Sequence, residues 1–405
     1  SRGCGRSPAS GKDELVKQII QRRCIFFVGG YDPKSPAAFF ERMKRELARF
    51  DALWDIETRM SPMAASDTGE IGTVRIDARS RDNRWATATD FSFFTVDNLV
   101  RTDFARPLPA RVGRYLIAFA DFVLTGTACR FFRKAWRFAL YFLYPFVAFL
   151  IFALLGLLAV WLTAPWLGWL SVLPGLVVYA TAQAILGKRW SVNHLMDLWS
   201  FSQHFIRGKR PDAEALMERF AQAVVDRARR ERADELILVG HSTGGMLILD
   251  IAARCLRIDP DFAGYCGQTT VLTLGSTALK AGLHPAGGKF RERVGLLSRD
   301  ERIGWTEIQC MTDVINFFRT NPADEMKLRT RPTFAYVREV QVRQMLLDET
   351  YRRIKMNPFR VHYQYIFGNS KRYWYDFFQI CCGPTPVMLR AERDIFGPLP
   401  EADNP

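Results

Sequence analysis

The fold is decided by one stretch of the sequence, ELILVGHSTGG at residues 235–245. Its first part, Glu235–Val239, is a mostly apolar run that predicts a buried strand, and Gly244–Leu256 has helical spacing. Between them, Gly240, Ser242 and Gly244 fit the pattern G-x-S-x-G, in which a serine occupies a tight turn from a strand into a helix. Small residues two positions before and after the serine avoid a clash in this turn. The stretch therefore predicts that Ser242 is a nucleophile beside a helix N-terminus, where negative charge is favoured.

Strand and helix patterns alternate outside one long apolar segment. Strands are predicted at Cys24–Val28, Thr73–Ala78, Thr269–Leu274 and Trp305–Gln309, and helices at residues 11–22, 35–54, 213–232 and 340–354. This alternation predicts an α/β fold with three layers and a mostly parallel sheet.

In this setting of strand, turn and helix, the segment GHSTGG resembles the lipases and esterases of the α/β-hydrolase superfamily. The resemblance covers residues 24–80 and 212–380, and the apolar segment interrupts it. It implies an α/β-hydrolase three-layer sandwich and a catalytic triad in the chain order serine, acid, histidine. In this chain the long insertion comes before the predicted nucleophile Ser242. Most members of the superfamily carry their insertion after the strand that follows the nucleophile, so the lid of those enzymes cannot be carried over to this chain.

The triad order selects one histidine. The chain has 5 histidines, and two of them, His194 and His204, precede the serine. His241 is the neighbour of the serine, and His284 lies before the next predicted strand. Because only His362 follows a plausible acid, we expect it to be the general base.

The acid is expected at the end of a strand between the serine and His362. Asp313 follows the predicted strand Trp305–Gln309 and would hold the imidazole in the required tautomer. The sequence leaves as alternatives Asp300, Glu301 and Glu307, and more weakly Asp348 and Glu349 inside a predicted helix.

Acyl transfer also requires two hydrogen-bond donors for the oxyanion. The backbone N–H of Thr243, the residue after the nucleophile, is the first that we expect. The second is expected from Gly30 or Tyr31, with Tyr31 preferred, in the loop after the strand Cys24–Val28. Glycine in that loop lets the backbone approach a substrate closely.

The long apolar segment, Phe138–Gly187, contains no Asp, Glu, Lys or Arg. Because a membrane-spanning helix needs about 20 apolar residues, the segment predicts an inserted transmembrane helical hairpin. Its spans are expected near residues 138–162 and 168–186, with a turn at 163–166. The tryptophans that gather at the turn, as aromatic side chains do at a bilayer interface, are Trp161, Trp166 and Trp169.

Two alternatives to a double crossing stay open. The segment could be a helical hairpin buried in a soluble domain, or a re-entrant hairpin kinked at Pro145 and Pro174. A second apolar stretch, Tyr115–Ala128, is short and contains an aspartate, so we expect it in the membrane interface or in the core.

Both ends of the apolar segment are basic, whereas the predicted turn has no Lys or Arg. The flanking cations are Arg130, Arg133, Lys134, Arg137, Lys188 and Arg189. By the positive-inside rule, both flanks and the bulk of the chain are expected in the cytoplasm, at a bacterial-type inner membrane or another membrane that faces it.

The chain is therefore expected to have four parts. Residues 1–100 and 211–396 form the two halves of the core, residues 101–210 the membrane-associated insert with its hairpin near 138–187, and 397–405 a tail. The basic segment 276–304 is expected to be a cap over the site or a solvated loop. The aromatic cluster at 373–378 is expected in the core, and the alternatives are that it lines an acyl pocket or touches the bilayer.

The charge and the remaining motifs exclude several classes of function. The net charge of +14 suggests a polyanionic partner. Because no nucleic-acid-binding motif is recognisable, an anionic membrane surface explains the charge better. Neither paired CxxC units nor a phosphate- or dinucleotide-binding glycine motif occurs, so no metal and no cofactor is expected. The 8 scattered cysteines are expected to be free thiols, and the polar N-terminal residues do not resemble a secretory signal.

Together these features predict a membrane-anchored serine esterase or lipase that forms an acyl-enzyme on Ser242. The bilayer would be its partner through residues 138–187, and a lipophilic ester its substrate. An acyltransferase with the same triad and a non-catalytic, hydrolase-like membrane scaffold are the alternatives. The sequence does not indicate an oligomeric state.

Overall fold

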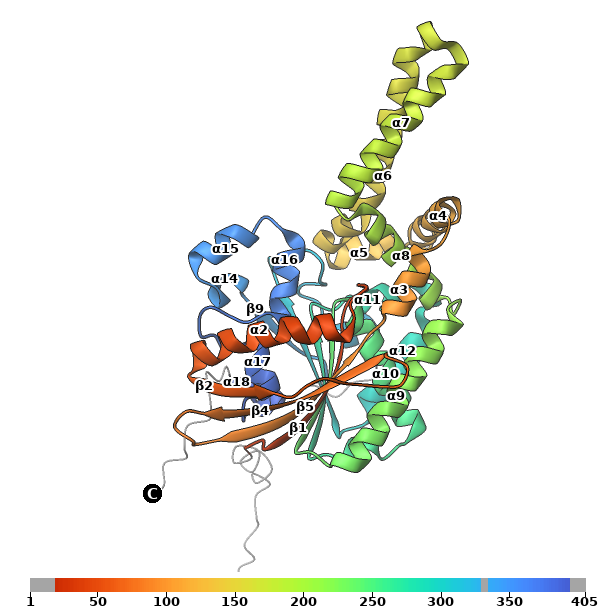
Figure 1. Cartoon of the computed structure of the whole chain (residues 1–405). Coiled ribbons are helices and arrows are strands. Elements are labelled where there is room, and N and C mark those ends of the chain that lie inside the picture. The colour runs from red at the N-terminus through yellow and green to blue at the C-terminus, as the bar shows by residue number, and fades with distance from the viewer. Residues whose placement is uncertain (1–18, 329–333, 394–405) are drawn as a thin grey trace, which may run out of the picture.

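The computed structural model describes residues 19–328 and 334–393, and its centre is a twisted, nine-stranded sheet (Figure 1). The strand order is β2-β4-β5-β1-β6-β7-β8-β9, and β3 pairs with β4. The strands are β1 (Arg22–Val28), β2 (Ile56–Met60), β3 (Ala64–Ala65), β4 (Ile71–Ser80), β5 (Ala86–Phe94), β6 (Glu235–His241), β7 (Gln268–Leu274), β8 (Ile303–Cys310) and β9 (Tyr336–Val340). The strands from β5 to β9 are parallel, whereas β2, β3 and β4 pair antiparallel. The prediction of an α/β fold with a mostly parallel sheet is confirmed.

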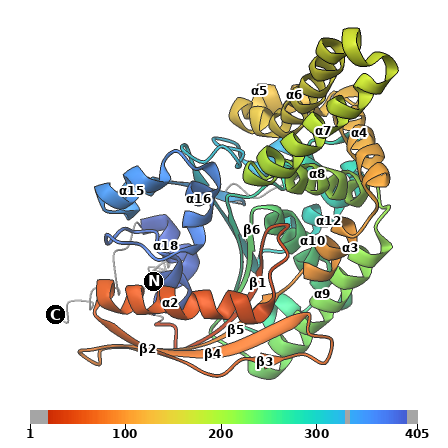
Figure 2. The same ribbon diagram turned by 45° about the horizontal axis from the view of Figure 1, so that its top comes forward.

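Helices cover both faces of the sheet (Figures 1 and 2). Alternate residues of β1 show this arrangement, because Phe26 and Val28 belong to one apolar core and Ile25 and Phe27 to the other. The first core is covered by α9 (Pro211–Glu231), α10 (Thr243–Ile258), α11 (Leu279–Gly282) and α12 (Gly288–Arg299). The second is covered by α2 (Pro36–Trp54), α14 (Val342–Met345), α16 (Pro358–Tyr363), α17 (Phe377–Cys382) and α18 (Val387–Arg393). The short helices α13 (Pro322–Glu325) and α15 (Asp348–Ile354) lie in the connections.

The segment between β5 and β6 forms a separate helical insert. Its helices are α3 (Asp97–Phe104), α4 (Leu108–Leu124), α5 (Thr127–Lys134), α6 (Trp136–Leu167), α7 (Val172–Ala182) and α8 (Val192–Ile206). At its base, Trp199 of α8 is fully buried among phenylalanines of α4, α5 and α6. This aromatic packing holds the helices of the insert together, and Phe317 of the core packs on two of these phenylalanines, Phe131 and Phe138.

Helices α6 and α7 form a hairpin that projects far beyond the rest of the molecule (Figures 1 and 2). The apolar helical segment Trp136–Gly187 is long and apolar enough to span a membrane. Gly156 and Gly175 let the two helices approach closely, because a Cβ on either would lie 2.9 Å from the carbonyl oxygen of the other.

The predicted turn of the hairpin was placed too early. Helix α6 continues through residues 163–166 to Leu167, with Pro165 inside it, and the reversal occurs at Gly168–Ser171. Gly168 has φ +54°, a conformation that glycine adopts without strain. The chain therefore reverses at the glycine rather than at the proline.

Helix α4 contains most of the stretch Tyr115–Ala128 and is half buried. Tyr115 and Phe122 face the core, whereas Leu116, Ile117 and Leu124 are exposed. Helices α4 and α5 meet at an angle of 65°. The stretch thus contributes to the core on one side and presents an apolar face on the other.

Three local predictions differ from the structure. The helix at 340–354 is wrong as a single element, because Val340 ends β9 opposite Cys310, and extended residues separate α14 from α15. The segment 276–304 is neither a cap nor a loop, because it forms α11 and α12, and Arg293 of α12 forms an ion pair with Asp250 of α10.

Most of the predicted helix at 11–22 and the whole tail at 397–405 lie outside the described residues. At the end of that predicted helix, Arg22 already begins β1. The aromatic cluster at 373–378 is buried, as expected.

Candidate active site

Ser242 occupies the turn between β6 and α10 in a strained backbone conformation. Its φ is +60° and its ψ is −124°, values that a residue with a side chain adopts only when the surroundings enforce them. A Cβ on Gly244 would overlap the carbonyl oxygens of Val28 and Gly29, and one on Gly240 would overlap the carbonyl of Gly244. The two glycines of the motif are therefore required by close backbone packing around the turn.

The structure brings Asp313 and His362 together, as the sequence predicts. His362 Nδ1 lies 2.8 Å from Asp313 Oδ2, and both side chains are buried. Asp313 follows β8, and its other carboxylate oxygen accepts a hydrogen bond from the backbone N–H of Ile315 at 2.9 Å. His362 lies in α16, and its Nε2 is buried without a hydrogen-bond partner among the described residues. The arrangement leaves Nε2 free to exchange a proton.

Ser242 and His362 line the same small cleft, together with Thr243, Gly30 and Tyr31. No hydrogen bond joins Ser242 Oγ to His362 Nε2 among the described residues. Catalytic hydrogen bonds are often long before a substrate binds, so this geometry is compatible with proton transfer between the two groups.

Gly275 keeps space for the histidine and its acid. It directly follows β7, whose last residue accepts the hydrogen bond from the N–H of Ser242 at 3.0 Å. A Cβ on Gly275 would lie 3.1 Å from both His362 Cε1 and Asp313 Oδ2, and the φ of Gly275 is +51°. Gly275 was not predicted from the sequence, although a glycine at the carboxyl end of a central strand was a usable signal.

The expected oxyanion donors lie beside Ser242. A Cβ on Gly30 would be 3.7 Å from Ser242 Oγ, so the loop after β1 passes close to the nucleophile. Within residues 19–328 and 334–393, the backbone N–H groups of Tyr31 and Thr243 donate no hydrogen bond. Both N–H groups remain available for a ligand.

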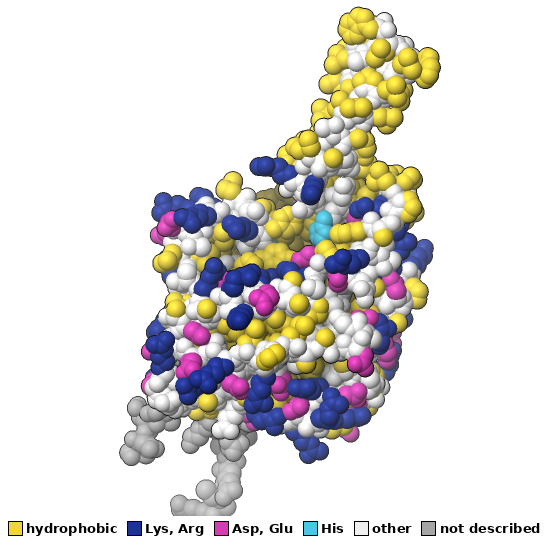
Figure 3. Space-filling view, viewed as in Figure 1, with side chains coloured by type: hydrophobic (Ala, Val, Ile, Leu, Met, Phe, Trp, Pro, Cys, Tyr) yellow, Lys and Arg dark blue, Asp and Glu magenta, His cyan; other side chains and the backbone are white. Residues whose placement is uncertain are grey.

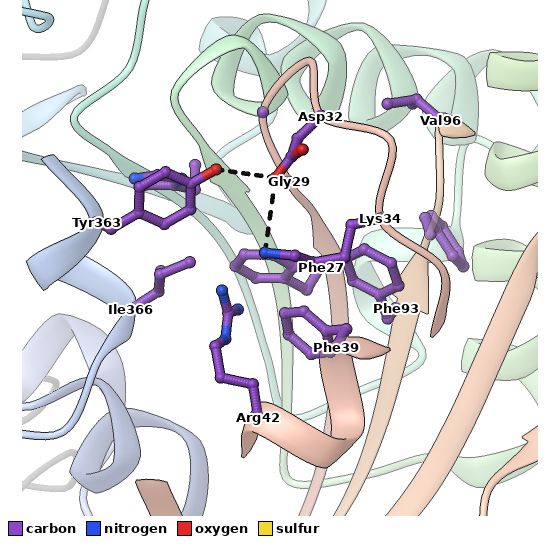
Figure 4. Close-up of a pocket in the computed structure, with 13 residues that line it drawn as sticks. Phe27, Gly29, Asp32, Lys34, Phe39, Arg42, Phe93, Val96, Tyr363 and Ile366 are labelled. Atoms are coloured by element: carbon purple, nitrogen blue, oxygen red, sulfur yellow. Dashed lines mark hydrogen bonds and ion pairs between the residues drawn. The ribbon is translucent and has the colours of Figure 1, made fainter. Parts of the chain in front are cut away.

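Polar contacts on two sides hold the loop at Gly29–Asp32 in place. The Tyr31 hydroxyl donates to Asp103 Oδ2 of α3 at 2.8 Å, so the insert itself anchors the loop. Asp32 accepts a hydrogen bond from the Tyr363 hydroxyl at 3.1 Å and pairs with Lys34 (Figure 4). Since Tyr363 follows His362 in the chain, this contact links the loop Gly29–Asp32 to the segment that bears the histidine.

The other histidines have different partners. His241 Nε2 lies 3.0 Å from the carbonyl oxygen of His362, and burial lowers the pKa of His241 well below its usual value. His194 packs on the ring of Tyr31 and lines the cleft, which the sequence did not indicate. His204 Nδ1 lies 2.9 Å from the carbonyl oxygen of Ser200, and His284 Nε2 lies 3.6 Å from Asp121 Oδ1.

The alternative acids lie elsewhere and have other surroundings. Glu307 accepts a hydrogen bond from Thr273, and burial raises the pKa of Glu307 to about 8. Asp300 pairs with Arg302, and Glu349 with Arg353. Asp348 lies near Lys371, and Glu301 sits in an exposed turn.

A buried lysine beside the nucleophile was also missed. Lys280 Nζ donates to Thr243 Oγ1 at 3.1 Å and to Ser202 Oγ at 3.0 Å, over the ring of Trp199. Burial lowers the pKa of Lys280 from 10.5 to about 7. In the sequence, Lys280 is one of several Lys and Arg residues of the basic segment 276–304, and no local pattern distinguished it from the others.

No group of three or more His, Cys, Asp or Glu side chains suited to a metal ion occurs within residues 19–328 and 334–393. In the same part of the chain, seven cysteines are free. A scan of protein-family models gives no match to this chain, and searches of curated proteins and of solved structures give none either. The function must therefore be argued from the site itself.

Proposed function

We propose that the protein is a membrane-anchored serine hydrolase of the α/β-hydrolase type, which cleaves a carboxylic ester of a lipid or of another lipophilic substrate. The observation that carries the proposal is the Asp313–His362 pair in the cleft of a strained Ser242. Serine, acid and histidine occur in the chain order of the α/β-hydrolases, with the serine on the strand-to-helix turn that these enzymes use.

The chemistry follows from this arrangement. Ser242 Oγ attacks the ester carbonyl carbon while His362 Nε2 takes the hydroxyl proton, and Asp313 stabilises the resulting imidazolium. The carbonyl oxygen becomes an oxyanion and accepts hydrogen bonds from the N–H groups of Thr243 and Tyr31. When this intermediate collapses, the alcohol leaves with the proton from His362. Water then hydrolyses the acyl-enzyme by the same steps.

The exposed apolar surface of the hairpin supports anchoring in a bilayer. At its tip, Trp161, Trp166 and Trp169 are 71%, 81% and 83% exposed. In water so large an apolar surface would promote aggregation, whereas lipid covers it. Helix α6 has 32 residues and is about 48 Å long at 1.5 Å per residue, which exceeds the roughly 30 Å hydrocarbon core of a bilayer.

Cations at the base of the hairpin support a cytoplasmic catalytic domain. Lys188 and Arg189 follow the apolar segment, and Arg137 precedes it with its guanidinium bonded to the carbonyl of Met311. Figure 3 shows this change from an apolar projection to a basic and acidic domain surface. Anionic head groups of the cytoplasmic leaflet would meet these cations.

A fluorophosphonate probe, which phosphonylates activated serines, tests the catalytic proposal. Wild-type protein should be labelled on Ser242, and Ser242→Ala and His362→Ala should abolish or strongly slow labelling. Ser298→Ala, a buried serine that donates to Gly295, and His204→Ala are matched controls that should label normally. Equal labelling of Ser242→Ala and wild type would refute the proposal. Product analysis with a lipid ester would then separate release of free acid from acyl transfer to another alcohol.

A further inference from the structure

We propose that an apolar groove at the base of the hairpin binds the acyl chain of the substrate and receives it sideways from the bilayer. This inference rests on the proposed function, and it specifies the substrate as a lipid whose hydrocarbon chain reaches Ser242 without crossing water.

The groove lies between the first turns of α6 and the segment that joins α15 to α16. Trp136 and Leu140 form one wall, and Met356 and Phe359 the other. Its cavity volume is about 580 Å³, whereas that of the cleft around Ser242 is about 50 Å³. The cleft can thus hold the reacting ester group, but a long chain needs the space of the groove.

The groove and the catalytic cleft adjoin each other. Four residues line both cavities and form their common wall: Tyr141, Leu195, Ile315 and Phe359. Ile315 stands two positions after Asp313, and Leu195 lies next to His194 in α8. A chain in the groove would therefore end next to the cleft that Ser242 and His362 line.

The mouth of the groove lies at the level where the proposed membrane surface begins. Trp136 and Trp190, at the two ends of the apolar segment, are 57% and 43% exposed at its rim, and aromatic rings of this kind favour the bilayer interface. Met356 on the opposite rim is 85% exposed. Figure 3 shows an apolar hollow between the base of the hairpin and the side that carries α15 and α16.

Cations of the hairpin lie at the mouth of the groove. Arg137 and Arg189 line the groove on this side and would hold its mouth against anionic head groups. An acyl chain in the bilayer would thus meet an apolar opening with cations beside it. The apolar lining, these cations and the wall shared with the cleft together assign the groove to a lipid chain.

Two fluorophosphonates that differ only in their alkyl chain, ethyl and dodecyl, test this inference on the full chain in mixed micelles. Wild-type protein should be labelled faster by the dodecyl probe. Leu140→Trp and Met356→Trp, on opposite walls and both solvent-accessible, should lower the dodecyl-to-ethyl ratio of rate constants about tenfold, the loss expected when two methylenes are no longer buried. Leu154→Trp, on the same helix α6 but outside the groove, is the matched control and should keep the wild-type ratio.

The outcomes separate the two proposals. A lower ratio in either groove variant, with the control unchanged, supports the chain-binding role. If both variants keep the wild-type ratio while Ser242 is labelled by both probes, the groove does not bind the chain, although the hydrolase proposal stands. If neither probe labels Ser242, the proposed function itself fails.

Discussion

Replacing Lys280 by methionine should change the stability of the protein in a way that depends on pH. The lysine is 1% exposed, and its pKa falls from 10.5 in the unfolded chain to about 7 because burial disfavours the charged form. At 1.36 kcal/mol per pKa unit, this difference corresponds to about 5 kcal/mol of stability lost when the side chain is charged in both states.

The sign follows from proton linkage. Between pH 7 and pH 10.5 the unfolded chain binds more protons at Lys280 than the folded chain does, so the contribution of this group to stability rises with pH over that range. Below pH 7 the side chain is charged in both the folded and the unfolded state, so the full free-energy cost of burying the charge is present. Lys280→Met removes this cost but also the two hydrogen bonds to Thr243 and Ser202, which contribute about 1 kcal/mol each.

We therefore expect the variant to be more stable than wild type by about 3 kcal/mol at pH 6 and less stable by about 1 kcal/mol at pH 10, where part of the burial cost remains. Denaturant unfolding of the detergent-solubilised protein, followed by tryptophan fluorescence at both pH values, measures the difference. Lys289→Met, an exposed lysine of α12, controls for the loss of a cation. A stability difference between Lys280→Met and wild type that does not vary with pH would show that the lysine stays charged in the folded protein, against the reasoning.

Three further predictions concern the triad and the hairpin. Asp313→Asn should slow probe labelling of Ser242 by about 10³-fold because His362 loses the acceptor that fixes its tautomer; Glu307→Gln, at a buried acid whose pKa is raised to about 8, should leave the labelling rate within about threefold. Gly275→Ala should lower both the labelling rate and the melting temperature, at a cost of about 1–3 kcal/mol, and an unchanged rate would show that the turn can shift without moving the triad. Gly175→Ile should separate α6 from α7 and increase hydrogen exchange in the hairpin, whereas the labelling rate in micelles should stay as in wild type.

The elements that the sequence predicted well are those with a strong local pattern. The apolar run before Ser242 and the helix after it, the amphipathic helix Pro36–Trp54 and the strand Gln268–Leu274 have one dominant period each. Chain order selected His362, whereas Asp313 was preferred to several other acids because it follows a predicted strand. The structure pairs the two residues.

What the sequence could not predict depends on contacts between distant segments. Strand β5 was not predicted because its first five residues, ATATD, have little apolar character. Its position depends on parallel pairing with β1, a contact between distant segments. Helix α6 continues past Pro165 because the turn is formed at Gly168. The burial of Lys280 and the roles of Leu195 and Tyr141 at the cleft arise only when the insert packs against the core.

The pairing of β1 with β6 has a consequence for biosynthesis. Arg23 and Glu235, paired in the parallel register of these central strands, are 212 positions apart, and the hairpin lies between them. At about 5–20 residues per second, a ribosome needs roughly 10–40 s to reach β6 after β1 has emerged. During this time the hairpin is already synthesised, while β1 still has an open edge that invites aggregation. If the hairpin inserts into a membrane as proposed, its insertion can precede completion of the sheet, and a defect in insertion should appear first as a low yield of folded protein.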